Sequence, residues 1–282
     1  MVSLGPFPMS LVVLLVAFAI AVAVGWKVAR VPGQPPLKVM PTILDMVFVG
    51  VVAARLGFVL QWLPEYLDDP WAIIRIGDGG FSLWAGVLAG LAFGTWRARN
   101  AKPLRRPLAM GALAGLASWA VLGGSLALMQ QSTLKLPATE LATLDRGTTS
   151  LSAMSGKPMV VNLWATWCPP CRREMPVLAD AQARRGDVTF AFVNQGEPEN
   201  VIRDYLRGEG MQLRNVLLDL FSSVSQEAGS RGLPTTLFFD ADGRLVDTHM
   251  GELSEATLTQ KLQRLGPTPS LNPSPVPSQE VN

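Results

Sequence analysis

Cys168 and Cys171 are the residues whose type and spacing are best suited to chemistry, and the sequence contains no other cysteine. A structural disulfide stabilises a protein mainly by closing a long loop of the unfolded chain, and a two-residue spacer closes almost none. The spacing therefore favours a reactive dithiol that cycles between thiols and disulfide. Zinc is the competing interpretation, but a structural zinc site needs four ligands, mostly Cys and His. The single histidine, His249, is predicted to be an exposed strand residue, and no metal is expected.

The cysteine pair lies where a strand is followed by a helix. Residues 159–164 form a nearly continuous apolar run, which is typical of a central strand covered on both faces. Helical periodicity begins at the pair and continues through Met175 and Leu178. Free N–H groups and the helix dipole favour an anion at a helix N-terminus. We therefore expect Cys168 to have a lowered thiol pKa and to act as the nucleophile, and Cys171 to resolve the mixed disulfide.

Pro169 and Pro170 separate the two cysteines. Proline has no backbone N–H and stiffens the chain, so both residues should influence the reduction potential. Whether the pair acts as a reductant or as an oxidant stays open at this point.

Strands alternate with helices on either side of this motif, which predicts an α/β domain with a central mixed sheet and helices on both faces. A short strand is expected near residues 141–144, and the sequence 240–243 is expected to form a hairpin turn. The remaining expected strands are 188–193, 216–220, 235–239 and 245–249, and the expected helices are 199–207, 222–228 and 255–265.

The first 130 residues differ sharply in composition from the rest, and they account for much of the chain's apolar fraction of 49%. Apolar runs of this kind predict helices that span a membrane. The four runs are 9–26, 41–62, 81–96 and 107–129. Small residues suited to close helix contacts lie in the last two runs: Gly86, Gly90, Gly111, Gly115 and Ser118.

Lysine and arginine in the loops predict the orientation of these spans. They are frequent in the first and third loops and rare in the second, so the first and third loops should be cytoplasmic and both termini periplasmic. The first run lacks a basic leader and a cleavage site, which favours a retained helix. The basic residues of these loops are Lys27, Arg30 and Lys38 in the first loop, and Arg97, Arg99, Lys102, Arg105 and Arg106 in the third.

The basic residues of the chain form no surface stripe, so no nucleic-acid partner is expected.

Arg55 lies inside the second predicted span. An ionisable residue at membrane depth is a candidate functional residue. The alternative is structural, in which the side chain contacts a backbone carbonyl or an acidic partner, or extends towards the interface.

Residues 162–176 read Asn-Leu-Trp-Ala-Thr-Trp-Cys-Pro-Pro-Cys-Arg-Arg-Glu-Met-Pro, and this segment resembles the TlpA/ResA branch of the thioredoxin-like proteins. The resemblance extends over about residues 136–265. It implies a cis peptide bond before Pro234 that packs against the disulfide and presents backbone to the substrate. Further substrate contacts are then expected from Trp167, Pro169, Pro170, Leu233 and Thr235.

The resemblance also bears on proton handling. Asn162 occupies the position at which thioredoxin has a buried aspartate, so proton transfer for Cys171 is assigned to Glu197, in a segment that resembles the acidic segment of the family. The alternative for Glu197 is a solvated loop carboxylate. Trp164 is expected in the core and Trp167 at the rim of the site.

The membrane half contains Ala54-Arg-Leu-Gly-Phe-Val-Leu-Gln-Trp62 and, after the second loop, Asp78-Gly-Gly-Phe-Ser-Leu-Trp-Ala-Gly86. This segment is similar to the N-terminal part of prolipoprotein diacylglyceryl transferase, and the resemblance covers about residues 10–100. The family's His-Gly-Gly reads Trp84-Ala85-Gly86 here, and its later polar signature has no counterpart. The membrane half is therefore expected to be a degenerate scaffold that acts as an anchor or as a platform for lipid or a partner.

The sequence thus predicts four parts: a four-helix membrane domain (1–130), a linker (131–135), a thioredoxin-like domain (136–266) and a disordered tail rich in Pro and Ser (267–282). The expected function is reduction or interchange of periplasmic protein disulfides, with no cofactor, in cytochrome c maturation or protein repair. A membrane protein of the DsbD type would supply the electrons. The alternatives are a lipid-modifying transferase with an attached redox domain and a scaffold that only binds.

Overall fold

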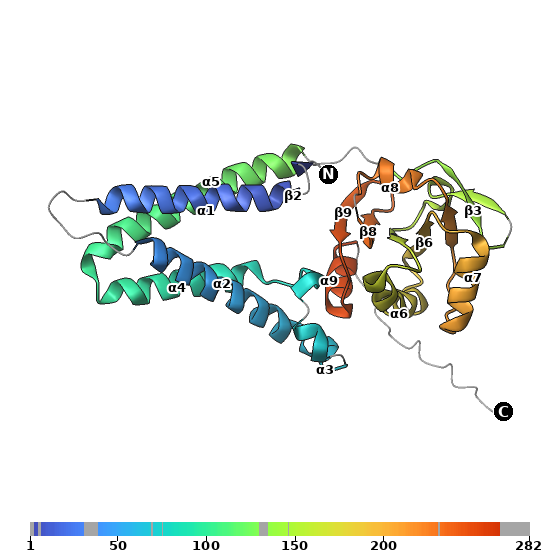
Figure 1. Cartoon of the computed structure of the whole chain (residues 1–282), viewed down its shortest axis with the longest axis horizontal. Coiled ribbons are helices and arrows are strands. Elements are labelled where there is room, and N and C mark those ends of the chain that lie inside the picture. Colours follow the sequence, from blue (N-terminus) through green and yellow to red (C-terminus); the bar gives the residue numbers. More distant parts are fainter. Residues whose placement is uncertain are drawn as a thin grey trace, which may run out of the picture. The chain divides into compact units, whose positions relative to one another are not determined.

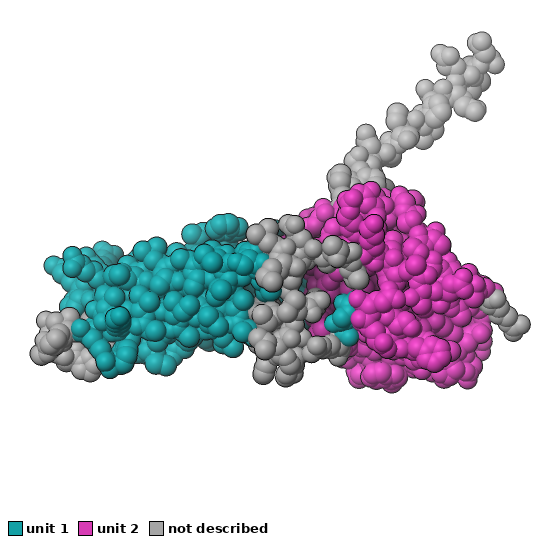
Figure 2. Space-filling view, turned by 90° about the horizontal axis from the view of Figure 1, so that it is seen from above, with its two compact units in different colours: residues 1–133, 228–230, 254–257 teal, residues 134–227, 231–253, 258–282 magenta. Residues whose placement is uncertain are grey.

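The computed structural model describes residues 3–4, 7–30, 39–68, 70–74, 76–129, 135–145, 147–230 and 232–265. Two compact units are distinguished in Figure 2. The predicted tail over 267–282 and the predicted linker, apart from Lys135, lie outside the described residues. The first unit consists of Met1–Thr133, Ala228–Ser230 and Ser254–Thr257, and the second of Leu134–Glu227, Arg231–Leu253 and Leu258–Asn282.

Long apolar helices make up most of the first unit (Figure 1). Among the residues that the structure describes, three stretches are long and apolar enough to cross a membrane: Val12–Ala29, Val39–Gln61 and Lys102–Leu126. The helix at the predicted third run has only 17 residues, which is short for a bilayer core that needs about 20 residues. The structure therefore supports three candidate spans, and the fourth stays a prediction. The helices are α1 (Met9–Ala29), α2 (Val39–Gln61), α4 (Leu83–Arg99) and α5 (Arg105–Met129).

These helices associate in two pairs, α1 with α5 and α2 with α4 (Figure 1). Glycine makes the close approach possible in each pair. A Cβ atom on Gly86 would lie 2.9 Å from the carbonyl oxygen of Gly50, and one on Gly111 would lie 2.7 Å from that of Ala21. The small residues therefore lie at helix contacts, as membrane helices require for close packing.

Two short strands, β1 (Ser3–Leu4) and β2 (Phe7–Pro8), precede α1. The described short elements between the long helices are α3 (Leu63–Asp68) and the 3-10 helices η1 (Pro70–Ile73), η2 (Ile76–Asp78) and η3 (Lys102–Leu104).

The second unit contains a sheet whose described strands follow the order β4-β3-β7-β6-β5-β8-β9. The inner strands β5, β6 and β7 are parallel, whereas β3, β8 and β9 pair in antiparallel fashion, so the sheet is mixed as predicted. The strands are β3 (Glu140–Thr143), β4 (Thr148–Ser150), β5 (Met159–Trp164), β6 (Thr189–Gln195), β7 (Val216–Asp219), β8 (Thr235–Phe239) and β9 (Leu245–Met250). The helices are α6 (Pro169–Arg184), α7 (Glu199–Gly208), α8 (Ser223–Glu227) and α9 (Glu255–Leu265), with the 3-10 helix η4 (Ser152–Met154).

Every residue of β5 is buried, which accounts for its unbroken apolar run. The core of this unit joins β5 to α6 through Trp164, Met175 and Leu178, none of which is exposed. The predicted turn at 240–243 is present, and Gly243 has a positive φ of 75° that a turn of this kind requires. This core fixes the orientation of α6 relative to the strand that precedes it.

Candidate active site

Four connecting segments meet at one edge of the sheet. Parallel strands end at the same edge, so Cys168 follows β5 there, Glu197 follows β6, and the residues after Asp219 follow β7. Strand β8 is antiparallel to β5, and its first residue, Thr235, pairs with Leu163 near the end of β5. The segment before β8 therefore reaches the same edge as the cysteines.

Cys168 and Cys171 form a disulfide, with an S–S distance of 2.04 Å and a Cα–Cα distance of 5.2 Å. Cys168 is the N-cap residue of α6, and its Sγ accepts a hydrogen bond from the Cys171 N–H at 3.3 Å. Pro169 and Pro170 have no N–H, so the first backbone N–H of the helix that can donate to Cys168 Sγ is that of Cys171. Cys168 is 3% exposed and Cys171 is fully buried. An incoming sulfur therefore approaches Cys168, and Cys171 is shielded.

The peptide bond between Leu233 and Pro234 is cis, as the resemblance implied. Pro234 is buried, and its carbonyl oxygen accepts a hydrogen bond from the Gly251 N–H at 2.9 Å. The Thr235 hydroxyl donates to the Gly232 carbonyl at 2.7 Å. These bonds fix the loop that lies beside the cysteine pair at the sheet edge.

The two tryptophans of the motif differ in environment. Trp164 is fully buried, whereas Trp167 is 67% exposed, directly before Cys168. Pro169 is exposed and Pro170 is half-buried. The surface around the disulfide is therefore largely apolar.

Glu197 is 7% exposed, so the interpretation as a solvated loop carboxylate was wrong. Its carboxylate accepts hydrogen bonds from the Thr166 N–H and from Asn194 Nδ2, both at 2.7 Å, and also from the Thr166 hydroxyl. Thr166 lies two residues before Cys168. These contacts hold the chain segment directly before Cys168 in place, which favours a positioning role for Glu197.

Glu174, which is fully buried in α6, was not predicted from the sequence. Its Oε1 accepts a hydrogen bond from Asn162 Nδ2 at 2.7 Å, and its Oε2 accepts one from the Leu253 N–H at 2.9 Å. Burial raises the pKa of this carboxyl to about 8, although both hydrogen bonds act in the opposite direction. Residues three apart on a helix are neighbours, so Glu174 lies on the same face as Cys171.

The sequence contained a signal for Glu174. Cys171, Glu174, Met175 and Leu178 follow the helical spacing that predicts one buried face. Because the other residues at this spacing are apolar, an acidic residue among them is expected to lie on the buried face of the helix. Asn162, on β5, faces this helix and donates a hydrogen bond to the Glu174 carboxyl.

His249 is 8% exposed, so the prediction of an exposed strand residue was wrong. It belongs to β9, and its Nε2 lies 3.3 Å from the Glu252 carbonyl oxygen. Among the residues that the structure describes, no group of three or more His, Cys, Asp or Glu could hold a metal ion.

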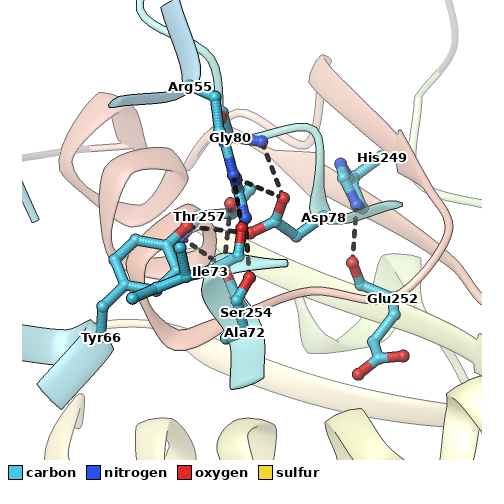
Figure 3. Close-up of polar contacts among 10 residues, drawn as sticks. All are labelled: Arg55, Tyr66, Ala72, Ile73, Asp78, Gly80, His249, Glu252, Ser254 and Thr257. Carbon is cyan, nitrogen blue, oxygen red and sulfur yellow. Dashed lines mark hydrogen bonds and ion pairs between the residues drawn. The ribbon is translucent and has the colours of Figure 1, made fainter. Parts of the chain in front are cut away.

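Arg55 lies near the end of α2 and binds the loop between α2 and α4 (Figure 3). Its Nη1 donates to Asp78 Oδ1 and to the Gly80 carbonyl, both at 2.8 Å. Its Nη2 and Nε donate to the carbonyls of Ala72 and Ile73 at 2.7 and 3.2 Å. Each guanidinium nitrogen thus has a protein acceptor, which favours the structural interpretation of Arg55.

A disulfide at a helix N-terminus, beside a cis-proline loop on a mixed sheet, defines the class of thioredoxin-like dithiol proteins. Comparison with known proteins agrees: the Redoxin family matches residues 131–262. The prolipoprotein diacylglyceryl transferase family matches residues 1–126.

Individual relatives give a finer assignment. "Thiol-disulfide oxidoreductase ResA" of Halalkalibacterium halodurans is 29% identical over 129 residues, covering 45% of this chain and 73% of the relative. "Thioredoxin-like protein YneN" of Bacillus subtilis is 30% identical over 130 residues, covering 45% of this chain and 75% of the relative. "Thiol:disulfide interchange protein DsbE homolog" of Paracoccus denitrificans is 30% identical over 169 residues, covering 58% and 93%. The chain belongs to the ResA/DsbE-type thiol–disulfide oxidoreductases and is a protein-disulfide oxidoreductase.

Proposed function

We propose that this protein is anchored in a bacterial inner membrane and reduces or interchanges disulfides of periplasmic proteins. The observation that supports this most strongly is the position of the Cys168–Cys171 disulfide, at the N-terminus of α6 and at the same sheet edge as the cis-proline loop. Apocytochromes c and misoxidised proteins are the substrates we propose.

The reaction proceeds through a mixed disulfide. The Cys168 thiolate attacks one sulfur of the target disulfide, and the other target sulfur leaves as a thiolate. Cys171 then loses its proton and attacks Cys168 Sγ. The target departs as a dithiol, and the Cys168–Cys171 disulfide forms. Since the sequence has no further cysteine, the two electrons for re-reduction come from a partner dithiol, for which a DsbD-type membrane protein is suited.

Glu174 is the group that we assign to the Cys171 proton. Its carboxyl lies on the same face of α6 as Cys171, and its pKa of about 8 is matched to proton exchange with a thiol. Glu197 holds the segment before Cys168 in position through its hydrogen bonds to Thr166.

Side chains around the sulfur form the substrate contact in this proposal. Trp167 and Pro169 are exposed, and Pro170 and Leu233 are half-buried. Thr235 begins β8 next to the cis-proline. Backbone of the cis-proline loop pairs with the target chain, and the apolar side chains exclude water from the reacting sulfurs.

The N-terminal unit serves as the anchor and contacts membrane lipid. We include α4 as a fourth span, which places both termini in the periplasm and the basic loops in the cytoplasm. Arg55 is bound to its own loop, and Trp84 replaces the transferase family's histidine. Both features favour an anchor over an acyl transferase.

One labelling experiment tests both compartment and redox direction. Because Cys168 and Cys171 are the chain's two cysteines, a small membrane-impermeant methanethiosulfonate reports on them alone. We expect labelling in intact spheroplasts without added reductant, because a reductase is kept reduced outside the cytoplasm. The matched control is Cys168→Ser/Cys171→Ser, which should take no label.

Two results would contradict the proposal. Labelling that requires prior treatment with dithiothreitol would indicate an oxidant. Labelling that requires permeabilised cells would place the pair in the cytoplasm.

A further inference from the structure

Large apolar side chains are exposed at the sheet edge that carries the disulfide. In the described part of the second unit, the exposed large apolar residues are concentrated in the segments that follow β5, β6 and β7. Two others, Val246 and Met250, lie on β9. The residues of the concentrated set are Trp167 (67% exposed), Val201 (37%), Leu220 (55%) and Phe221 (82%).

Hydrogen bonds join the segments that carry these side chains. Glu197 accepts from the Thr166 N–H, directly before Trp167. The Gly196 N–H donates to the Asp219 carbonyl at 3.0 Å, directly before Leu220. The segments that carry Trp167 and Leu220 are therefore joined through the segment that follows β6.

The turn that carries Leu220 and Phe221 is fixed at both ends. The Asp219 carboxylate accepts hydrogen bonds from the N–H groups of Ser223 and Val224 at 2.8 and 2.9 Å. Ser222 has a positive φ of 53°, and its N–H donates to the Asp219 carbonyl at 3.1 Å. Because the backbone of the turn is already fixed, binding requires no further ordering of the loop that carries these side chains.

We propose that Leu220 and Phe221 form a docking surface for an apolar residue of the target protein, next to the target's reacting cysteine. This inference rests on the exchange reaction at Cys168. A partner's sulfur must bond to Cys168, so the partner's adjoining chain lies over this edge. A cluster of exposed apolar side chains on a soluble domain marks such a contact. The segment that carries Leu220 and Phe221 is joined by the hydrogen bonds of Gly196 and Glu197 to the segment that carries Trp167, directly before Cys168.

The strand order of the sheet determines the distance between the proposed docking surface and Cys168. β7 is two strands from β5, and neighbouring strands lie about 4.8 Å apart, so the surface is offset from the cysteine by about 10 Å. An extended chain advances about 3.3 Å per residue. The preferred target therefore has an apolar residue about three positions from its reacting cysteine.

Peptide disulfides test this spacing. Each substrate is a symmetric dimer of a single-cysteine peptide with Leu or Ser three positions before or after the cysteine. The reduced full chain in nanodiscs converts each dimer to two thiol peptides and becomes oxidised. For one of the two positions, before or after the cysteine, we expect the Leu peptide to exceed its Ser counterpart about tenfold in the second-order rate constant for oxidation of the chain, which corresponds to about 1.4 kcal/mol.

The variant Leu220→Ser/Phe221→Ser should bring the Leu-to-Ser ratio to about one and leave the rate with Ser peptides unchanged. The matched control Val246→Ser/Met250→Ser should retain the tenfold ratio. A retained ratio in the first variant, or equal rates for Leu and Ser peptides with the unmodified chain, contradicts the docking surface alone. A chain that reduces none of the peptides contradicts the exchange reaction itself.

Discussion

Cys171→Ser should accumulate target proteins on Cys168 as mixed disulfides, whereas Cys168→Ser should accumulate none. The structure supports this asymmetry because Cys168 is the N-cap residue with a small exposed fraction, and Cys171 is fully buried behind it. Without the resolving sulfur, release of the target depends on an external thiol. Well-oriented intramolecular groups have effective concentrations far above cellular thiol levels, so the mixed disulfide should persist at least about a thousandfold longer.

The measurement is a comparison of the full-length variants on non-reducing gels after acid quenching of cells, followed by mass spectrometry of the trapped species. Cys168→Ser/Cys171→Ser is the background control. Equal trapping by the two single variants would contradict the assignment, and trapping by Cys168→Ser alone would reverse the roles of the two sulfurs.

Glu174→Gln should change how the stability of the thioredoxin-like domain depends on pH. The folded-state pKa of this carboxyl is about 8, above the ordinary value of about 4.3 that the unfolded chain has. Between these values the unfolded state has released a proton that the folded state retains, so the wild-type domain loses stability as the pH rises through this window. Glutamine keeps an oxygen acceptor for the Leu253 N–H and does not titrate.

The stability of Glu174→Gln relative to wild type should therefore increase from pH 5 to pH 8, by an amount on the order of a few kcal/mol. Thermal unfolding of the full chain, followed by near-ultraviolet circular dichroism at several pH values, measures this difference. The control is Glu209→Gln, because Glu209 is an exposed carboxylate paired with Arg172. If the unfolding curves of Glu174→Gln and wild type keep a constant separation across this range, the carboxyl is not held protonated by the fold.

The features that the sequence predicted well depend on local patterns. The apolar run 159–164 has the bounds of β5, and the periodicity of residues 255–265 has the bounds of α9. The cysteine pair follows from spacing alone. The cis bond before Pro234 followed from a motif specific enough to imply a backbone conformation.

The features that did not follow from the sequence depend on contacts between distant segments. The sequence left the burial of Glu197 open, and in the structure Thr166, 31 residues earlier in the chain, donates to its buried carboxylate. Glu174 is enclosed by Asn162 on one side and by Leu253 on the other. His249 is buried although it lies on β9, an outermost strand of the sheet. Loop and edge residues carry no periodic signal that predicts such enclosure.

The membrane half shows a limit of another kind. Composition identified its apolar runs, but α4 has 17 residues, close to the minimum length of a membrane span. A short helix of this kind pairs with α2 through Gly86, and apolar content does not determine whether it crosses the bilayer.

The most direct test of the central claim is the reduction of insulin by dithiothreitol in the presence of the purified full chain. The account predicts that the wild-type chain shortens the delay before the insulin B chain precipitates, and that Cys168→Ser leaves the delay as it is with dithiothreitol alone. Equal delays for the wild type and Cys168→Ser would contradict thiol–disulfide exchange at Cys168.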